Sequence, residues 1–218
     1  MFSKAVRIFE EHSDSCSTRK RDLLFEQRWN HPKSYVKELL FMNKCHEEVI
    51  KGIRPSTVIF TRHDICRTCG ALDSNPGLQW IKTNRGGGQT YHDPGQILCY
   101  PIIDLAAFKI KQGSYNEILC QWLYNSIFFL VCTEVSLYKE ERPEIMKNGL
   151  WLSGKKVAFI GTRISQGVTL HGFSVNFNTD LNEFTKILPC GYKNLPVGNL
   201  NIEANKIVEA LIKFCPFK

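Results

Sequence analysis

The chain has 218 residues, 43% of them hydrophobic, and a formal net charge of +7. A chain of this length can bury one sizeable core, so we expect a single domain that needs no partner to fold. The longest apolar run, residues 127–132, is far shorter than the ~20 residues that cross a bilayer, which argues against a membrane span.

The cysteines and the distribution of charge narrow the class further. The nine cysteines are an odd number, and several lie within apolar segments such as ILCQWL at residues 118–123. This pattern indicates free thiols in a reducing compartment rather than a disulfide framework. The 28 basic residues are spread along the chain rather than gathered into a stripe. We therefore do not expect nucleic-acid binding, and an acidic protein partner fits the charge equally well.

The first residues are typical of neither a core element nor a clean targeting peptide. Lys4, Arg7 and the basic triplet at 19–21 favour an organellar address, whereas Glu10 and Asp14 depart from the acid-poor composition of a transit peptide. We expect residues 1–30 to form an N-terminal extension, a possible targeting segment, and residues 31–218 to form the domain.

The next segments predict a helix followed by two strands. Apolar residues recur at helical spacing over residues 34–51, and Gly52 follows as a stop signal. The short run STVIFT (56–61) is rich in β-branched residues and predicts a strand, and GALDSNPG (70–77) predicts a loop. A second strand is predicted at ILCYPII (97–103).

The second half of the chain alternates strands and helices. Ser114 and Glu117 have capping-box spacing ahead of an apolar stripe that predicts a five-turn helix ending near Leu130. Strands follow at 150–152, 156–161 and 169–178, where alternation of apolar and polar residues in the last predicts a half-buried strand. A helix over residues 202–214, capped by Asn201, closes the chain. The predicted class is α/β, or α+β with a mixed sheet.

Cys190 is the first candidate for chemistry. Most free cysteines fill the core. Pro189 before it and Gly191 after it, in PCGY, instead favour a sharp turn and an exposed nucleophile.

Lys156 comes directly before the predicted strand VAFIG and is the second candidate. Most lysines are solvated charges, but a lysine at the mouth of a strand can face a nucleophile on a neighbouring strand.

Two further patterns admit both a plain and a functional interpretation. The segment NRGGGQTYH (84–92) lacks the Gly-Lys-Ser/Thr of a phosphate-binding loop, so it is either a flexible loop or a place where backbone approaches a ligand such as an acyl chain. His63, Cys66 and Cys69 form one Cys-x-x-Cys without a second pair, so we expect strand-end residues and no metal site. His92 and His171, each beside a glycine-containing turn, are interpreted as structural histidines.

Three segments together resemble one family. RGGGQTYHDPGQ (85–96), KVAFIGTRISQGVTLHGF (156–173) and LPCGY (188–192) are similar in order and spacing to the lipoyl(octanoyl) transferases, and the likeness extends from about Tyr35 to about Gly191. The resemblance implies the fold of biotin and lipoate protein ligases, with a larger and a smaller β-sheet flanked by helices. It also implies a catalytic pair, Cys190 and Lys156. The implied substrate-binding residues are Arg85, Gly86, Gly87, Gly88, Gln89, Thr90, Tyr91, His92, Phe159, Ile160, Gly161, Gly172, Phe173 and Ser174.

The activity that the resemblance implies is an acyltransferase reaction without ATP or cofactor. An octanoyl group passes from octanoyl-acyl-carrier-protein, through a cysteine thioester, to a lysine of lipoyl domains in the E2 subunits of 2-oxoacid dehydrogenases and in the glycine cleavage H protein. The alternatives are an ATP-dependent lipoate or biotin protein ligase and a catalytically impaired lipoyl-domain-binding protein. Asp93 keeps the second alternative open, because the family usually has glycine at this position; aspartate tolerates left-handed backbone, but its side chain could perturb His92. Resemblance to eukaryotic members suggests mitochondria, with apicoplast or cytoplasm as alternatives.

Overall fold

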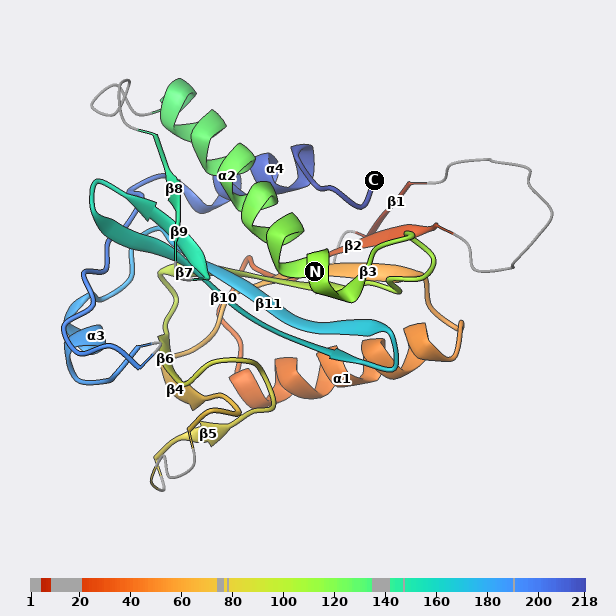
Figure 1. Cartoon of the computed structure of the whole chain (residues 1–218), viewed down its shortest axis with the longest axis horizontal. Helices are drawn as coiled ribbons and strands as arrows, with labels where there is room; N and C mark the ends of the chain where they lie inside the picture. The colour runs from red at the N-terminus through yellow and green to blue at the C-terminus, as the bar shows by residue number, and fades with distance from the viewer. Residues whose placement is uncertain are drawn as a thin grey trace.

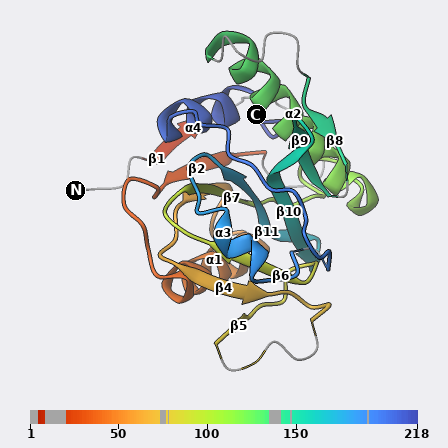
Figure 2. The same cartoon turned by 90° about the vertical axis from the view of Figure 1, so that its left-hand side faces the viewer.

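The computed structural model describes residues 21–73, 77, 79–134, 142–146, 148–189 and 191–218, together with the backbone of residues 5–8. An eight-stranded mixed sheet forms the centre of the molecule, and a three-stranded sheet lies beside it. Helix α1 covers one face of the large sheet, and α2 and α4 cover the other (Figure 1). Seen from the side, the small sheet lies at the same end of the molecule as α1 (Figure 2). The predicted architecture of a larger and a smaller sheet flanked by helices is confirmed.

The strands of the two sheets come from distant parts of the chain. The large sheet has the order β1 (Ala5–Ile8), β2 (Leu23–Gln27), β3 (Ser56–Thr61), β7 (Gln96–Ile102), β11 (Val168–Asn176), β10 (Lys155–Ser165), β9 (Gly149–Leu152) and β8 (Glu144–Ile145). The small sheet has the order β5 (Ile81–Lys82), β4 (Cys66–Cys69) and β6 (Gln89–His92). In the large sheet only β2 and β3 run parallel among the described pairs, so antiparallel pairing dominates.

The helices form where the apolar periodicity predicts them. Helix α1 spans Tyr35–Ile50, and α2 spans Tyr115–Glu134 after a 3-10 turn at Gln112–Ser114. The short α3 spans Asn182–Thr185, and α4 spans Ala204–Lys213. The predicted cap of the last helix is wrong: the helix starts after Glu203, and Asn201 lies outside it with a φ of +54°.

Two cores hold the layers together. On the side of α2 and α4, the ring of Trp122 meets the rings of Phe173 and Phe217 edge-on, at centroid distances of 5.2 and 5.7 Å. On the opposite side, Met42 and Val49 of α1 pack against the sheet. Because both faces are covered, every residue of β11 is buried, and the prediction of a half-buried strand is wrong.

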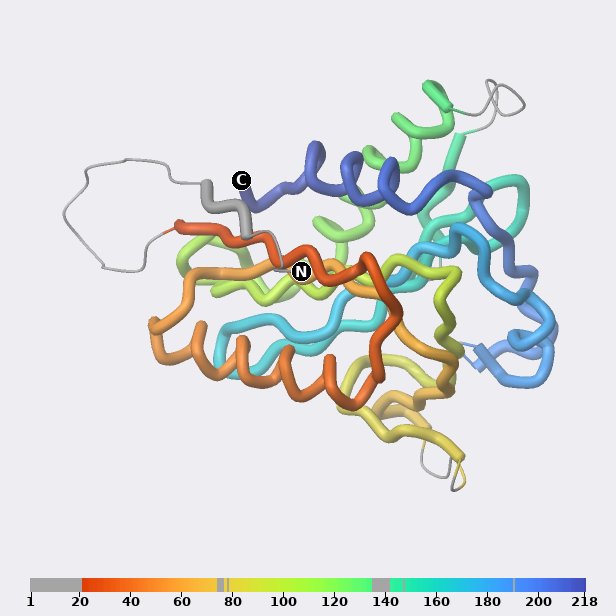
Figure 3. The backbone as a smooth tube through the Cα atoms, turned by 180° about the vertical axis from the view of Figure 1, so that it is seen from behind, coloured from red at the N-terminus to blue at the C-terminus, as the bar shows by residue number. Residues whose placement is uncertain are grey.

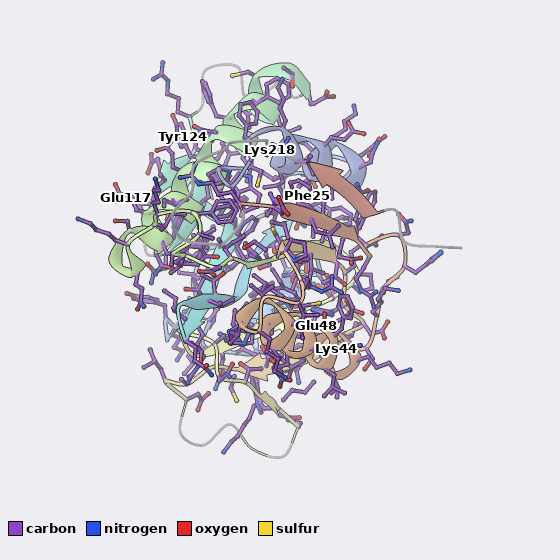
Figure 4. All side chains as sticks on the ribbon, turned by 90° about the vertical axis from the view of Figure 1, so that its right-hand side faces the viewer. Phe25, Lys44, Glu48, Glu117, Tyr124 and Lys218 are labelled. Atoms are coloured by element: carbon purple, nitrogen blue, oxygen red, sulfur yellow. The ribbon has the colours of Figure 1, made fainter. Side chains whose placement is uncertain are left out.

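The folded domain starts earlier than the sequence predicts. Strand β2 pairs with β3, and its Leu23 and Phe25 belong to the main core. Figure 4 shows Phe25 beneath the C-terminal Lys218, whose Nζ lies 5.9 Å from the centre of the ring. The view from behind also shows the C-terminus beside β2 (Figure 3). The segment expected to be an extension, residues 1–30, therefore includes two strands of the large sheet. No helix among the described residues is both long and apolar enough to cross a bilayer.

Candidate active site

The glycine-rich segment before β6 is a tightly tied loop rather than a flexible one. The guanidinium of Arg85 donates hydrogen bonds to the carbonyl oxygens of Gly86 (3.1 Å), Gly88 (2.8 Å) and Thr68 (3.1 Å). Gly87 has a φ of +86°, a conformation that favours glycine. We call residues 85–89 the glycine loop. Arg85 thus acts on the loop backbone, which fixes the loop against the small sheet.

Strands β10 and β11 supply the facing wall, and glycines allow the close approach. Gly161 and Gly172 lie opposite each other in the ladder. A Cβ on Gly161 would lie 3.1 Å from the carbonyl oxygen of Gly86, and one on Gly172 would lie 2.1 Å from that of Cys99. Gly161 therefore allows the close approach of the glycine loop to the sheet, and Gly172 allows the close approach of β7 to β11.

A narrow cavity of about 60 Å³ lies between the glycine loop and this wall. This volume is below the ~300–1,000 Å³ typical of small-molecule sites, so the cavity suits a slender chain rather than a bulky ligand. Every residue predicted to bind substrate lines it except Tyr91, whose ring instead packs behind the wall against Phe184 and Ile187. The structure adds lining residues that the sequence did not indicate: Tyr35, Leu98, Tyr100 and His171. We call this space the acyl cavity.

Aromatic and histidine side chains form the part of the cavity beside α1. The ring of Tyr35 stacks on His92 at 5.7 Å and lies 4.8 Å from His63. His63 Nε2 and the hydroxyl of Tyr100 are hydrogen-bonded at 2.7 Å, and His92 Nδ1 and Gln96 Oε1 at 2.8 Å. These four polar atoms are therefore hydrogen-bonded within the protein, and the rings present apolar surface to the cavity.

The histidines at the cavity are neutral at working pH. Burial, with a smaller contribution from His63, lowers the pKa of His92 to about 3. Burial lowers the pKa of His63 to about 4, and burial followed by the charge of Arg85 lowers that of His171 to about 3. Burial also raises the pKa of Tyr35 to about 12. Apart from Arg85, whose guanidinium donates to backbone carbonyl oxygens, the described lining residues are uncharged, which suits an alkyl chain better than a charged ligand.

His171 was interpreted as structural, and the structure gives it a place in the cavity wall. Its φ is +57°, an unusual conformation for a residue within a strand. Its Nε2 is hydrogen-bonded to the side-chain oxygen of Asn84 at 2.6 Å, which ties β11 to the start of the glycine loop. Its position between Leu170 and Gly172, in TLHGF, is the signal in the sequence that could have identified it.

Lys156 is buried at the start of β10, with a fully inaccessible side chain. Its Nζ lies 4.9 Å from the centre of the Phe159 ring, and Phe159 itself lines the acyl cavity. A Cβ on Gly149 would lie only 2.4 Å from Cε of Lys156, so this glycine leaves room for the side chain. Lys156 therefore lies in the interior at the mouth of its strand rather than in solvent, and its pairing with residue 190 stays a prediction.

Residue 190 lies outside the described residues, but the chain on both sides of it is placed. Pro189 forms a bridge with Gln89 of the glycine loop, and the N–H of Leu188 donates to the side-chain oxygen of Gln89 at 3.0 Å. Further on, Val197 forms a bridge with Lys156. Gly191 has a φ of +80°, as expected for a sharp turn. The segment that carries the predicted nucleophile therefore runs from the glycine loop to Lys156.

Asp93 does not adopt the left-handed conformation that its family position suggested. Its Oδ1 accepts a hydrogen bond from the N–H of Gly95 at 2.8 Å, so the carboxylate closes the turn. His92 is bonded to Gln96 rather than to Asp93. The aspartate thus serves the turn between β6 and β7 and leaves the histidine in the cavity wall.

The Cys-x-x-Cys segment forms strand β4, in agreement with the interpretation as strand residues. His63 lies at the end of β3 and is hydrogen-bonded to Tyr100. Among the described residues, no group of three or more potential ligands could hold a metal ion.

A second hollow lies on the outer side of the glycine loop. It has a volume of about 1330 Å³, including space open to solvent. It shares residues 86–89, Ile160 and Gly161 with the acyl cavity and continues past Gly191. We call it the outer groove. The two spaces are therefore continuous, and Leu188, Gly191 and Tyr192, on either side of residue 190, line the outer one.

A mixed sheet with a small second sheet, a glycine-walled slot and a buried lysine beside it define the class of protein. The chain belongs to the family described as the lipoyl protein ligase A/B catalytic domain, which matches residues 34–213. This confirms the resemblance drawn from the sequence.

Curated relatives within this family carry a more specific name. The octanoyltransferase of Christiangramia forsetii is 40% identical over 197 residues, which cover 82% of this chain and 81% of the relative. The octanoyltransferase of Geobacter metallireducens is 34% identical, with 70% and 71% covered, and that of Thermobifida fusca is 30% identical, with 86% and 82% covered.

Solved structures show the same fold at low sequence identity. A lipoate-protein ligase A bound with ATP is 18% identical with a TM-score of 0.65, covering 86% of this chain and 82% of its own. A bipartite lipoate protein ligase from Thermoplasma acidophilum, described with its E2 lipoyl domain, is 15% identical with a TM-score of 0.59, covering 86% and 80%. At these identities the likeness concerns the fold alone.

Proposed function

We propose that this protein is an octanoyltransferase that moves an octanoyl group from an acyl carrier protein to a lysine of lipoyl domains, in lipoate biosynthesis. The curated relatives and the matched family support octanoyl transfer. The observation that carries the proposal is the acyl cavity, a mostly apolar slot in which Arg85 is the one charged residue among the described lining residues. Its wall includes Phe159, the ring that contacts the amine of Lys156. The cysteine intermediate described below is the finer part of the proposal.

In the first half-reaction the thiolate of Cys190 attacks the carbonyl carbon of the octanoyl thioester. The bond from this carbon to the donor sulfur breaks, and the donor leaves as a thiol or thiolate. One thioester replaces another, so little free energy changes and no ATP is required. An ordinary thiol, with a pKa of about 8.5, is mostly protonated at neutral pH. The positive charge of Lys156 would favour the thiolate by attraction.

In the second half-reaction the neutral amine of the acceptor lysine attacks the octanoyl thioester. The amide bond forms, the bond from carbon to the Cys190 sulfur breaks, and the amine loses a proton. Once Cys190 is acylated it carries no negative charge, so Lys156 releases its own proton more readily and can then accept the proton of the incoming amine. Formation of an amide from a thioester is downhill and drives the cycle.

Selection of an eight-carbon chain would rest on the apolar lining of the acyl cavity. Six buried methylenes at ~0.8 kcal/mol each give roughly 5 kcal/mol before the cost of ordering the chain. This is enough to favour octanoyl over much shorter groups. Rings of Tyr35, His92 and Tyr100 bound the cavity on the side of α1, and His92 is uncharged, so this side of the cavity suits an alkyl chain.

The partners in this proposal are octanoyl-acyl-carrier-protein as donor and, as acceptors, lipoyl domains of 2-oxoacid dehydrogenase E2 subunits and the glycine cleavage H protein. Carrier proteins and lipoyl domains tend to be acidic, and the formal charge of +7 on this chain would steer both toward it. Raising ionic strength should therefore slow both half-reactions when whole proteins are the substrates.

We also propose a mitochondrial location, supported by the basic residues Lys4, Arg7 and 19–21 and by the resemblance to eukaryotic members. A fluorescent fusion at the C-terminus of the full chain should colocalise with a mitochondrial marker. A signal confined to the cytosol or to another organelle would contradict this address without affecting the enzymatic proposal.

The test of the function is intact-protein mass spectrometry after incubation with octanoyl-acyl-carrier-protein. We expect one octanoyl adduct, absent in Cys190→Ser and discharged when a lipoyl domain is added. Cys120→Ser is the matched control, because Cys120 is half-buried within the electrostatic reach of Lys156 and should not be needed. Transfer that persists in Cys190→Ser and requires ATP with free octanoate would instead favour the ligase alternative.

A further inference from the structure

The outer groove has the chemistry of an amide-binding channel. Side-chain amides of Asn116 and Asn148 lie on its wall, with the hydroxyl of Thr162 and the backbone of the glycine loop. The hydroxyl of Thr162 donates to Oδ1 of Asn116 at 2.9 Å, which fixes the orientation of that amide. Asn148 has a φ of +52°, and its carbonyl accepts from the N–H of Ile160 at 3.0 Å, which holds it at the edge of β10.

Apolar side chains border the same groove and remain in solvent. Leu72 is 81% exposed, Leu188 is 47% exposed and Tyr192 is 45% exposed. Large apolar side chains that are exposed around a hollow indicate a surface that is covered during function. The backbone N–H of Leu72 donates a hydrogen bond to the carbonyl oxygen of Gly87 at 3.2 Å. This bond holds Leu72 against the glycine loop.

The groove is continuous with the acyl cavity through a shared wall. Gly86, Gly87 and Gly88 line both spaces, and an added Cβ on Gly88 would meet nothing within 4 Å. A side chain at Gly88 would therefore project into open space at this wall rather than into the protein. A thioester whose alkyl chain lies in the cavity would direct its other substituent along the groove.

We propose that the outer groove binds the pantetheine arm of the donor, with Asn116 as the hydrogen-bonding partner of the amide farther from the sulfur. The inference rests on the proposed function, because it assigns the second half of the same substrate. Pantetheine is a linear chain with two amide groups, so it needs neutral donors and acceptors along an extended path. An acceptor lysine side chain has no amide in its stem and would make no use of Asn116 and Asn148. Asp73 also lines the groove, and the two asparagine amides are what favour the donor arm over the acceptor.

The experiment compares two thioester donors that differ only in the length of this arm. Octanoyl-pantetheine carries both amides, whereas S-octanoyl-N-acetylcysteamine keeps only the amide next to the sulfur. One lost hydrogen bond is worth ~0.5–1.5 kcal/mol, so Asn116→Ala should lower kcat/KM for octanoyl-pantetheine by roughly 2- to 12-fold. The short donor should react at the wild-type rate. Leu72→Asp, at an exposed position that tolerates substitution, should also discriminate against the longer donor.

The control is Gln121→Ala, on the same helix but at an exposed position outside the groove. It should leave both donors unaffected. An equal loss with both donors in Asn116→Ala would overturn the proposal, since the residue would then serve the acyl end. A loss confined to transfer from the acyl-enzyme to a lipoyl domain would assign the groove to the acceptor instead.

Binding of free pantetheine separates this inference from the proposed function. Saturation-transfer NMR should detect pantetheine on the wild-type protein and a weaker signal on Asn116→Ala. If neither donor acylates the protein, the proposed function fails, while pantetheine binding that depends on Asn116 would still support the groove. A third outcome is that both donors acylate the protein, pantetheine does not bind, and Asn116→Ala affects both donors alike. This would overturn the proposal for the outer groove and leave the proposed function intact.

Discussion

The carboxylate of Asp93 is hydrogen-bonded to the backbone of Asp180, whose N–H donates to Oδ2 at 2.8 Å. Its other oxygen accepts from the N–H of Gly95. The segment after Asp180 forms α3, whose Phe184 stacks on Phe159 at 5.5 Å and precedes the turn at Pro189. Asp93 therefore anchors the start of the segment that leads to residue 190. A residue that departs from the family pattern supports the site instead of disturbing it.

Replacing Asp93 with the glycine usual in the family should weaken the protein. The variant Asp93→Gly loses two hydrogen bonds to a buried carboxylate and gains backbone freedom, so we expect the free energy of unfolding to fall by roughly 2–4 kcal/mol. Urea denaturation measures this change. Asp93→Asn keeps one acceptor oxygen, so its free energy of unfolding should lie between those of the wild-type protein and Asp93→Gly. If Asp93→Gly were equally stable and faster in octanoyl transfer, the impaired-enzyme alternative would regain support.

The parts of the site that could be predicted from the sequence are those in which function requires a local backbone shape. The glycine loop and the opposed Gly161 and Gly172 are such places, because a Cβ at Gly161 or Gly172 would collide with backbone of another segment. Strand and helix positions followed from apolar periodicity for the same local reason. The alternation of apolar and polar residues in β11 predicted a half-buried strand, which is wrong. The sequence of a single strand does not show whether one or both of its faces are covered by other elements.

The residues that could not be predicted depend on contacts between distant segments. Tyr35 begins α1, Tyr100 lies in β7, and both reach the cavity only because these elements pack side by side. Tyr91 shows the opposite error: it stands within a binding motif, but the pleat of β6 turns its ring toward Phe184. Asp93 was unpredictable because its partner, Asp180, follows a different strand.

Lys156 should control the pH dependence of acylation. Lys156→Met removes the charge but keeps a long side chain for a buried position, and we expect acylation of Cys190 at neutral pH to slow by ~10²–10⁴-fold. The rate should recover as pH rises through the ordinary thiol range near ~8.5, because hydroxide then supplies the thiolate. Stopped-flow acylation at several pH values measures both effects. Lys155→Met, at the adjacent exposed lysine, is the control, and an unchanged pH profile in Lys156→Met would exclude the proposed role.

Acid should destabilise the fold through the buried histidines. The pKa of His92 is about 3 and that of His63 about 4, whereas an unfolded chain titrates near ~6.5. Between these values the unfolded state binds protons that the folded state does not, so stability is present above pH ~6.5 and falls as pH decreases. Each such histidine lowers the free energy of unfolding by up to ~1.4 kcal/mol for each pH unit of acidification.

Urea midpoints measured between pH 7.5 and 5 should therefore decline with acidity. The slope of the free energy of unfolding against pH measures how many more protons the unfolded state binds. In His92→Gln this number should be smaller by about one, even if the variant is less stable at pH 7.5. His31→Gln, at an exposed position, should leave the slope unchanged. A flat profile in the wild-type protein would show that these side chains are not buried in neutral form.

Leu98 should limit the length of the acyl chain. It is 2% exposed, lines the acyl cavity and packs in the core beneath α1, so Leu98→Ala would extend the cavity toward that helix. Two further methylenes at ~0.8 kcal/mol each would raise kcat/KM for decanoyl relative to octanoyl donors by up to roughly 15-fold.

The free energy of unfolding of Leu98→Ala should fall by ~2–5 kcal/mol, as for other core truncations. Ile59→Ala truncates the same core without touching the cavity and controls for this loss. Competition between octanoyl and decanoyl donors, analysed by mass spectrometry of the acyl-enzyme, measures the preference; an equal shift in both variants would mean that the cavity end lies elsewhere.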